Sequence, residues 1–159
     1  MTINGRTTTI SDMMRPPVTV GLGLTLKEVL EKMIHERRNS LTVVDGQGKF
    51  VGAVSALEII KEVVPDYIEE SDTVATYANE ELFREDALRV ANVPIEKFMV
   101  KDIPTITVDG SLVKAAVLAT QYGRGRITVV DSEHKPVGVL TRTELKRVIG
   151  SFLDIRDRQ

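Results

Sequence analysis

Two short motifs each place a hydroxyl residue three positions before a glutamate. Ser55 precedes Glu58, and Thr141 precedes Glu144. A hydroxyl at the start of a helix can cap that helix, or it can donate to a phosphate held at the helix N-terminus. A carboxylate one turn later can accept hydrogen bonds from hydroxyl donors. The hydroxyl and the acid of each motif are therefore candidate hydrogen-bonding groups for a ligand.

The same four residues also have an interpretation that needs no ligand. Ser-x-x-Glu and Thr-x-x-Glu are capping boxes, in which the hydroxyl and the carboxylate satisfy free backbone N–H groups at the helix start. The motifs by themselves do not choose between a helix cap and a ligand site.

A glycine precedes each motif by the same distance, Gly52 in one case and Gly138 in the other. A glycine inside a strand lets another group approach the backbone closely. Each glycine lies in a β-branched run, 49–55 or 135–141, that predicts a strand leading into the helix of the motif.

The elements around the two motifs follow one order, which is β-α-β-β-α. Prolines exclude a helix in the first segment of each copy, and Thr25 or Ser111 caps the helix that follows. The helix at 111–122 is almost wholly apolar, so we expect it to be the more completely buried of the pair. The predicted elements are extended segments at 16–20 and 103–108, helices at 25–38 and 111–122, strands at 40–45, 49–55, 126–131 and 135–141, and helices at 56–64 and 142–152.

The two copies are related by an internal repeat. With an offset of about 86 residues, Met13 falls on Met99, and the sequence TVVD at Thr42 falls on TVVD at Thr128. Roughly a quarter of the aligned positions are identical and the alignment needs no gap, which indicates a duplication.

An acidic segment separates the two copies. We assign 8–64 to the first repeat, 65–94 to an insert and 95–153 to the second repeat. Apolar residues of the insert recur with rough helical spacing up to Pro94, so we expect one or two helices there. The insert is either a solvated connection or a surface that packs on the sheet edge or on a partner.

The composition narrows the classes of function. The 159 residues are 42% hydrophobic and 28% charged, carry a net charge of −2 and include no cysteine. These values exclude disulfides and thiolate chemistry and give no support to nucleic-acid or membrane binding. The chain has no signal-peptide pattern and no apolar run that could span a membrane, so we expect a soluble cytoplasmic protein. Two lone histidines form no metal set and no nucleotide-hydrolase, Rossmann or nucleophile-elbow motif is present, so we expect neither an enzyme nor a metal site.

The duplicated pattern resembles a tandem pair of CBS (cystathionine-β-synthase-type) repeats, known as a Bateman module. The resemblance is carried by VSALE at 54–58, by LTRTE at 140–144, and by the glycine and the TVVD strand before each. It implies an α/β (α+β) fold in which two small sheets, each with two helices, pack about a pseudo-two-fold axis. It also implies a homodimer of two such modules. Both motifs end in Glu where the family more often has Asp, which keeps the charge but adds a methylene.

The resemblance also implies ligand sites. Members of the family bind adenosine-containing ligands such as AMP, ADP, ATP or S-adenosylmethionine in two clefts between the repeats. Mg²⁺ is a candidate companion of a nucleotide's phosphates, but no carboxylate cluster in the sequence requires it, so we expect no required cofactor. The residues that the family pattern places in the clefts are Met13, Val18, Arg38, Asn39, Ser40, Ala53, Ser55, Glu58, Met99, Pro104, Arg124, Arg126, Val139, Thr141 and Glu144.

One difference in charge separates the two implied clefts. The cleft that contains Glu144 has Arg126 near the phosphates, where the other cleft has Ser40. A guanidinium favours a phosphate in a partly desolvated site, so we expect the cleft with Glu144 to bind its ligand more tightly. The sequence GRGR around Arg126 is also typical of a solvated basic loop.

These patterns favour a regulatory sensor module. Such a module would bind an adenine nucleotide or a related adenosyl ligand and would pass its occupancy to a regulated protein partner through the dimer surface. The alternative is a ligand-free module for dimerisation or protein docking, in which side chains fill the clefts. An adenosyl ligand that raises the melting temperature would separate the two.

Overall fold

The chain divides into two compact units, which are described one at a time. The computed structural model describes residues 2–3, 6–64, 79–121 and 125–155. One unit comprises Val18–Gly46 and Val51–Lys101, and we name it the Glu58 unit. The other comprises Met1–Pro17, Gln47–Phe50 and Asp102–Gln159, and we name it the Glu144 unit. The segment that begins each repeat therefore belongs to the compact unit of the other repeat.

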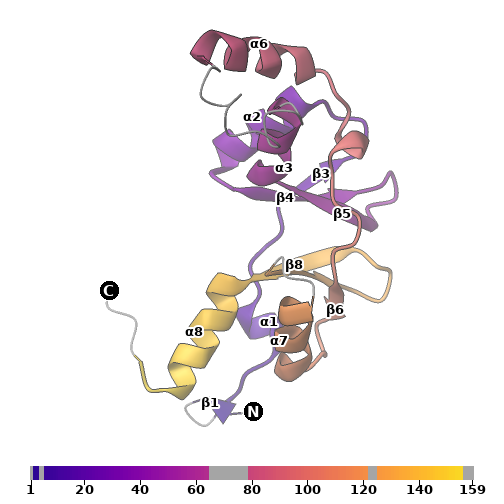
Figure 1. Ribbon diagram of the computed structural model, residues 1–159. Coiled ribbons are helices and arrows are strands. Elements are labelled where there is room, and N and C mark those ends of the chain that lie inside the picture. The colour runs from indigo at the N-terminus through magenta and orange to yellow at the C-terminus, as the bar shows by residue number, and fades with distance from the viewer. Residues whose placement is uncertain (1, 4–5, 65–78, 122–124, 156–159) are drawn as a thin grey trace. The chain divides into compact units, whose positions relative to one another are not determined.

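The Glu58 unit is a three-stranded sheet with its helices on one face (Figure 1). Its strand order is β3-β4-β5, and β3 pairs in parallel with β4. Its elements are β3 (Thr19–Gly21), α2 (Leu26–Glu36), β4 (Ser40–Val44), β5 (Phe50–Ser55), α3 (Ala56–Val63), α6 (Glu80–Val90) and the short 3-10 helix η1 (Ile95–Lys97).

The Glu144 unit repeats this design and adds the N-terminal segment to it (Figure 1). Its sheet has the order β6-β7-β8, with β6 parallel and β8 antiparallel to β7. Its elements are β1 (Thr2–Ile3), β2 (Arg6–Thr7), α1 (Ile10–Met13), β6 (Thr105–Thr107), α7 (Leu112–Gln121), β7 (Arg126–Val130), β8 (Pro136–Thr141) and α8 (Arg142–Phe152). The predicted β-α-β-β-α order is confirmed in both repeats.

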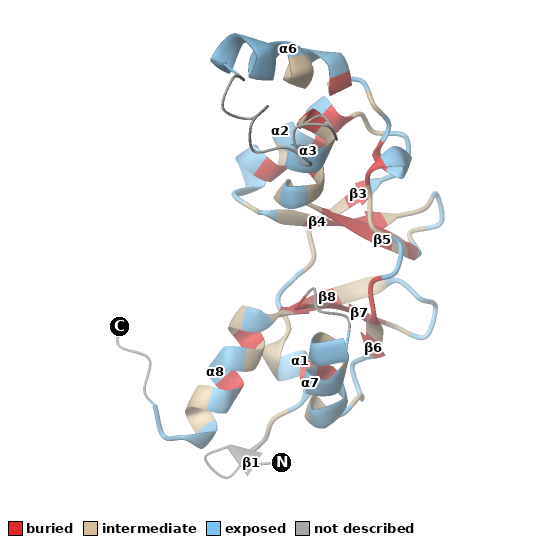
Figure 2. Ribbon diagram, viewed as in Figure 1, coloured by how far each residue is buried: buried red, intermediate tan, exposed pale blue. Residues whose placement is uncertain are grey.

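Each unit has its own apolar core, formed by the strands and by the helix faces that turn toward them (Figure 2). Leu41 and Val29 are fully buried in the Glu58 unit, as are Ile127 and Leu140 in the Glu144 unit. Fully burying such a side chain contributes about 1.5–3 kcal/mol, so the two cores hold the strand ends that carry the motifs in place.

The helix starts follow the predicted capping residues. In α2, Thr25 Oγ1 accepts from the N–H of Glu28 at 3.3 Å, and the Glu28 carboxylate accepts from the N–H of Thr25 at 2.7 Å. Ser111 Oγ accepts from the N–H of Lys114 at 3.1 Å at the start of α7. A cap of this kind stabilises a helix by about 1 kcal/mol, which explains why both helices begin where the sequence predicts.

Helix α7 is less buried than its apolar sequence predicted. Within the helix, the buried residue is Ala115, whereas Val113 and Val117 are 62% and 45% exposed. The prediction is wrong because a helix on one face of a small sheet turns one side toward that sheet, whatever its remaining residues are. The outer face of α7 is therefore an apolar surface.

The repeats begin in a register that differs from the predicted one. Ile10 and Ile95 are each the first residue of a helical turn, and both are almost fully buried. The carbonyl of Ile10 accepts from the N–H of Met14 at 3.0 Å, and that of Ile95 accepts from the N–H of Met99 at 2.9 Å. Met14 is therefore the structural counterpart of Met99.

The predicted equivalence of Met13 with Met99 is wrong by one residue. The strands that follow keep the predicted offset, because Thr19 pairs with Thr42 just as Thr105 pairs with Thr128. The second repeat thus has one more residue between its first turn and its first strand. A gapless alignment conceals this because residues 13 and 14 are both methionine.

The insert between the repeats contains helix α6, as the spacing of its apolar residues predicted. The end of this helix is held beside α2, where the N–H of Leu26 donates to the carbonyl of Val93 at 2.9 Å. Residues 65–78 of the insert lie outside the described residues. The predicted boundaries at 8–64, 65–94 and 95–153 stay a prediction. Over the described part of the chain, no helix is long and apolar enough to cross a membrane.

Candidate functional site

The motif of the second repeat forms the predicted capping box. Strand β8 ends at Thr141, which caps α8. One carboxylate oxygen of Glu144, Oε2, accepts from the N–H of Thr141 at 2.8 Å and from its hydroxyl at 2.5 Å. The Glu144 side chain is 4% exposed. The hydroxyl hydrogen of Thr141 is thus already donated to Glu144.

The second oxygen of Glu144 is in a different position. Oε1 is buried and accepts no hydrogen bond from any described residue. Arg15 Nε lies 3.5 Å from it, which makes an ion pair but is too long for a good N–H···O hydrogen bond. Because a buried acceptor without a donor costs free energy, a hydroxyl donor supplied by a ligand would be stabilised there.

Arg15 is fixed by its backbone, whereas its side chain is half-exposed and pairs with Glu144. Its N–H donates to the carbonyl of Val139 at 2.9 Å, and its carbonyl accepts from the N–H of Val139 at 2.9 Å. Pro16 holds the residue before it in an extended conformation, which suits this pairing. Sequence analysis did not identify Arg15, and its position before a proline was the signal that could have drawn attention to it.

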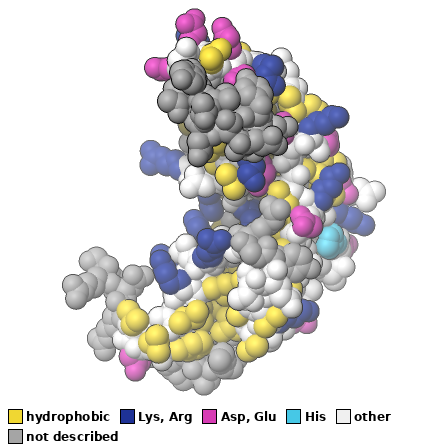
Figure 3. All heavy atoms as spheres, viewed as in Figure 1, with side chains coloured by type: hydrophobic (Ala, Val, Ile, Leu, Met, Phe, Trp, Pro, Cys, Tyr) yellow, Lys and Arg dark blue, Asp and Glu magenta, His cyan; other side chains and the backbone are white. Residues whose placement is uncertain are grey.

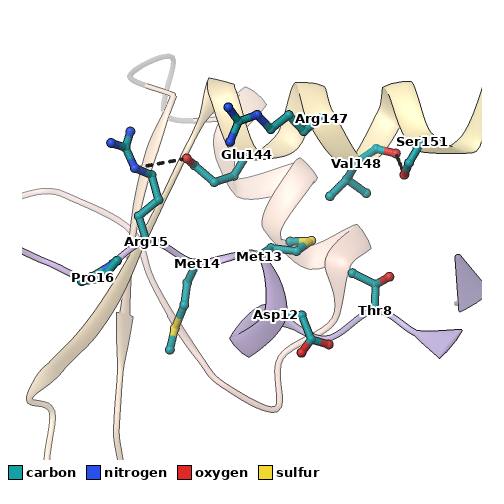
Figure 4. Close-up of a pocket in the computed structure, with 10 residues that line it drawn as sticks. All are labelled: Thr8, Asp12, Met13, Met14, Arg15, Pro16, Glu144, Arg147, Val148 and Ser151. Carbon is teal, nitrogen blue, oxygen red and sulfur yellow. Dashed lines mark hydrogen bonds and ion pairs between the residues drawn. The ribbon is translucent and has the colours of Figure 1, made fainter. Parts of the chain in front are cut away.

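Glu144 and Arg15 lie at one end of a cavity of about 730 Å³ within the Glu144 unit (Figure 4). Figure 4 shows the guanidinium of Arg147 at this same end. The apolar side chains of Met13 and Val148 lie further along. The lining residues come from the N-terminal segment and from one face of α8, and they are Thr8, Asp12, Met13, Met14, Arg15, Pro16, Glu144, Arg147, Val148 and Ser151. The cavity therefore joins a charged end to an apolar middle.

Two further arginines are close to the start of α8. Arg126 is paired with the last residue of β8. Arg142 is the first residue of α8, and its side chain lies across Gly125, where a Cβ would come within 2.3 Å of the Arg142 Nε. Neither of them lines the cavity, so the arginines that the cavity offers to a ligand are Arg15 and Arg147.

The motif of the first repeat forms the same cap in a less charged setting. Glu58 Oε2 accepts from the N–H of Ser55 at 2.6 Å and also from its hydroxyl. Glu58 is half-buried, whereas Glu144 is buried. The residue that pairs with Ala53, in the place that Arg15 has beside Val139, is Val100, with N–H···O distances of 2.9 and 2.8 Å.

Three arginines near or within α8 are not repeated in the sequence of the Glu58 unit. The counterparts of Arg126, Arg142 and Arg147 at the same places in the repeat are Ser40, Ala56 and Lys61. The two motifs thus share the hydroxyl and the acid but differ in the residues at these positions.

The two glycines before the motifs allow the close approach that the sequence predicted. A Cβ on Gly138 would come within 2.3 Å of Met14 Sδ, and a Cβ on Gly52 within 2.5 Å of the Val100 carbonyl oxygen. Gly138 therefore makes room for a side chain, and Gly52 makes room for backbone.

The predicted site residues divide between the two units. Met13, Pro104, Arg126, Val139, Thr141 and Glu144 belong to the Glu144 unit, and Val18, Arg38, Asn39, Ser40, Ala53, Ser55, Glu58 and Met99 to the Glu58 unit. Arg124 lies outside the described residues.

Within the Glu144 unit, the cavity brings Met13 and Glu144 together, whereas Pro104 is buried and its carbonyl accepts from the N–H of Thr128 at 3.0 Å. In the Glu58 unit, Met99 packs against the core and the carbonyl of Asn39 accepts from the N–H of Ala56 at 2.9 Å.

Metal ligands do not gather in either unit. No three His, Asp or Glu side chains of the described residues lie close enough together to hold a metal ion.

The fold and the paired motifs define a class of protein, and comparison with known families names it. The model of the CBS domain matches residues 10–65 and again residues 95–151. The chain therefore belongs to the CBS domain family, as a tandem pair. The two matches begin 85 residues apart and end 86 residues apart, in agreement with the one-residue change of register.

Solved structures and a curated relative agree with this assignment. The CBS domain pair of protein MJ0100, solved with 5′-methylthioadenosine and S-adenosyl-L-methionine, is 23% identical with a TM-score of 0.67, covering 91% of this chain and 98% of that one. The cytosolic domain of the Mg²⁺ channel MgtE, solved with ATP, is 20% identical with a TM-score of 0.65, covering 88% and 48%. The L-aspartate semialdehyde sulfurtransferase of Methanocaldococcus jannaschii is 24% identical over 144 residues. The match covers 90% of this chain but 23% of that enzyme.

Proposed function

We propose that the chain is a regulatory module, without catalytic activity of its own, that binds an adenine nucleotide or a related adenosyl ligand. The observation that carries this proposal is the buried Oε1 of Glu144, which accepts no hydrogen bond from a described residue and faces a cavity. A ribose hydroxyl is a donor of the right kind for this oxygen, and it adds no charge to the buried site.

The cavity suits the other parts of such a ligand. Met13 and Val148 offer apolar contact to an adenine ring, and the guanidinium groups of Arg15 and Arg147 offer partners to phosphate oxygens. Solved relatives of the same fold bind methylthioadenosine, S-adenosylmethionine and ATP, which share the adenosyl group.

Glu58 and Ser55 form a second candidate site on the same principle. Their cap leaves the Glu58 carboxylate half-buried rather than buried. A ribose there would displace water from the carboxylate, so its hydrogen bond would contribute less binding free energy. Binding at either site would favour the conformation of the chain that has the higher affinity for the ligand. A regulated protein would respond to that change of conformation.

A ligand panel tests the proposal. AMP, ADP, ATP and S-adenosylmethionine are added at millimolar concentration, and the melting temperatures of the wild type, Glu144→Gln and Glu133→Gln are recorded. Glu133 is a matched control, because it is an exposed glutamate of the same unit. We expect at least one ligand to raise the melting temperature of the wild type and of Glu133→Gln, and Glu144→Gln to bind it about tenfold more weakly. No shift with any ligand, or equal binding by Glu144→Gln, would contradict the proposal.

A second candidate function is assembly through the helices of the Glu144 unit. Apolar side chains gather over the outer face of α7 and α8 (Figure 3), and they include Val113, Val117, Ile149 and Phe152. A second copy that packs on this face would form a homodimer. Light scattering tests this, since the wild type should have the mass of a dimer and Val117→Glu that of a monomer, whereas a monomeric wild type would contradict it.

A further inference from the structure

The counter-ion of the buried acid differs between the two sites, and this difference has a consequence for the ligand. In the Glu144 unit, Arg15 Nε lies 3.5 Å from Glu144 Oε1. At the same place beside Ala53, the Glu58 unit has Val100, which carries no charge. Arg15 therefore has an uncharged residue, Val100, as its counterpart in the Glu58 unit.

Arg15 is built so that its side chain can move while its backbone stays. Two hydrogen bonds of 2.9 Å tie its peptide groups to Val139. Its side chain is 46% exposed, and the partner it faces is 4% exposed. Because the ion pair is longer than a hydrogen bond, a better partner for the guanidinium would take it from Glu144 at little cost.

A second guanidinium near Arg15 favours an anionic partner. Arg147 lines the same end of the cavity (Figure 4). The other acid that lines the cavity is Asp12, whose carboxylate accepts from the N–H and hydroxyl of Thr9 at 3.1 and 2.9 Å. A phosphate at the end with Glu144 would meet the guanidinium groups of Arg15 and Arg147, and these groups would repel a sulfonium cation.

We propose that Arg15 is an exchangeable counter-ion that makes the Glu144 site select phosphorylated adenosyl ligands. In the empty site it pairs with Glu144, and when a nucleotide binds, a ribose hydroxyl takes its place at Oε1 while the guanidinium turns to the phosphate. A nucleoside without phosphate also displaces the guanidinium from Glu144 but offers it no new partner, so it lacks the contact that a phosphate gains. This inference rests on the proposed adenosyl site.

The selection is measured as the ratio of two dissociation constants, that of adenosine to that of AMP, by isothermal titration calorimetry. All variants carry Glu58→Gln, so that the Glu144 site dominates the signal. The test variant adds Arg15→Gln, and the control adds Arg84→Gln, which removes the same charge from the exposed face of α6. A circular dichroism melt confirms that each variant is folded.

We expect the ratio to fall about tenfold or more in Arg15→Gln and to change less than about twofold in Arg84→Gln. Adenosine should bind Arg15→Gln at least as well as the parent, because no ion pair has to be separated. S-adenosylmethionine should bind the parent more weakly than AMP does. Arg15→Gln should reduce this difference between the two dissociation constants.

Three results would overturn the inference: an unchanged ratio in Arg15→Gln, an equal loss of AMP and adenosine, or an equal fall in Arg84→Gln. If the Glu58→Gln parent binds AMP and adenosine but the ratio does not depend on Arg15, the proposed function stands and this inference fails. If neither the wild type nor this parent binds any adenosyl ligand, the proposed function fails and this inference fails with it.

Discussion

The Glu144 site and the Glu58 site share the same helix-capping motif, but the residues around the motif differ. Both place an acid three residues into a helix, and both hold it with the N–H and hydroxyl of the capping residue. They differ in burial, since Glu144 is buried and Glu58 half-buried, and in the residue that faces the acid from the neighbouring segment. The shared part supplies a helix cap, and we propose that the unshared part selects the ligand.

The comparison also separates what stabilises the fold from what serves a site. The cap, the glycine before it and the backbone pairing beside it recur in both units, as the fold requires. Arg15, Arg126 and Arg142 do not recur, because the residues at the same places of the first repeat are Val100, Ser40 and Ala56. A residue that repeats is therefore a candidate for structure, and one that does not repeat is a candidate for specificity.

The largest effect that we expect on stability distinguishes the two glycines. Gly52→Ala would press a Cβ against the Val100 carbonyl, which two hydrogen bonds to Ala53 hold in place. Gly138→Ala would press on the Met14 side chain, which can partly turn away. We expect a loss of about 3 kcal/mol in the free energy of unfolding for Gly52→Ala and about 1–2 kcal/mol for Gly138→Ala, measured in urea. Equal losses would show that the two close approaches are alike.

The next effect concerns the acids themselves. Glu144→Ala removes the acceptor for the N–H and hydroxyl of Thr141 in a buried place, so we expect a loss of about 2 kcal/mol in the free energy of unfolding. Glu58→Ala removes a half-buried acceptor, which water can replace, and should cost about 1 kcal/mol. Urea unfolding of the two variants checks the order, and a larger loss for Glu58→Ala would refute the assigned difference in burial.

A smaller effect follows from giving one site the residue of the other. Arg15→Val copies Val100 into the Glu144 unit and removes an ion pair whose cation is half-exposed. The free energy of unfolding should fall by less than about 1 kcal/mol, because such pairs are screened by water. A loss above about 2 kcal/mol would make Arg15 a structural residue, and its place in ligand selection would need another explanation.

The smallest effect is a pH dependence in the loop before α7. Asp109, whose counterpart in the first repeat is Gly23, has its pKa lowered mainly by a hydrogen bond from the Thr107 side chain. A carboxylate with a lowered pKa stabilises the fold above its unfolded pKa of about 3.9 and loses this effect as the pH falls through its folded pKa. Asp109→Asn should therefore melt slightly below the wild type at pH 7, and the gap should close below about pH 4. A difference in melting temperature that does not change with pH would show that the effect comes from the introduced amide rather than from the lost charge.

The order of the elements was predictable because local signals fix it. The capping residues Thr25 and Ser111, the prolines before them and the β-branched strands each have a short-range cause. The fate of the apolar α7 face was not predictable, because which side of a helix is buried depends on the elements around it. The exchange of starting segments between the two units is also a tertiary property, and no local pattern records it.

The candidate site was predictable in its acids and not in its cation. Thr141 and Glu144 lie in one short motif at a helix start, so their separation in sequence already predicts that their side chains are close together. Arg15 reaches Glu144 across 129 positions of sequence, and the adjacent methionines at 13 and 14 hid the register that makes Arg15 the counterpart of Val100 in the repeat. The predicted phosphate contact, Arg126, lies at the start of α8 but does not line the cavity.

The direct test of the difference between the two sites is the affinity for AMP of two single variants, measured by isothermal titration calorimetry. Glu144→Gln removes the acid from the site surrounded by arginines, and Glu58→Gln makes the same change in its counterpart. We expect Glu144→Gln to weaken AMP binding by about tenfold or more and Glu58→Gln to change it by less than about twofold. Equal losses in the two variants, or a larger loss in Glu58→Gln, would contradict the assignment of the phosphorylated ligand to the Glu144 site.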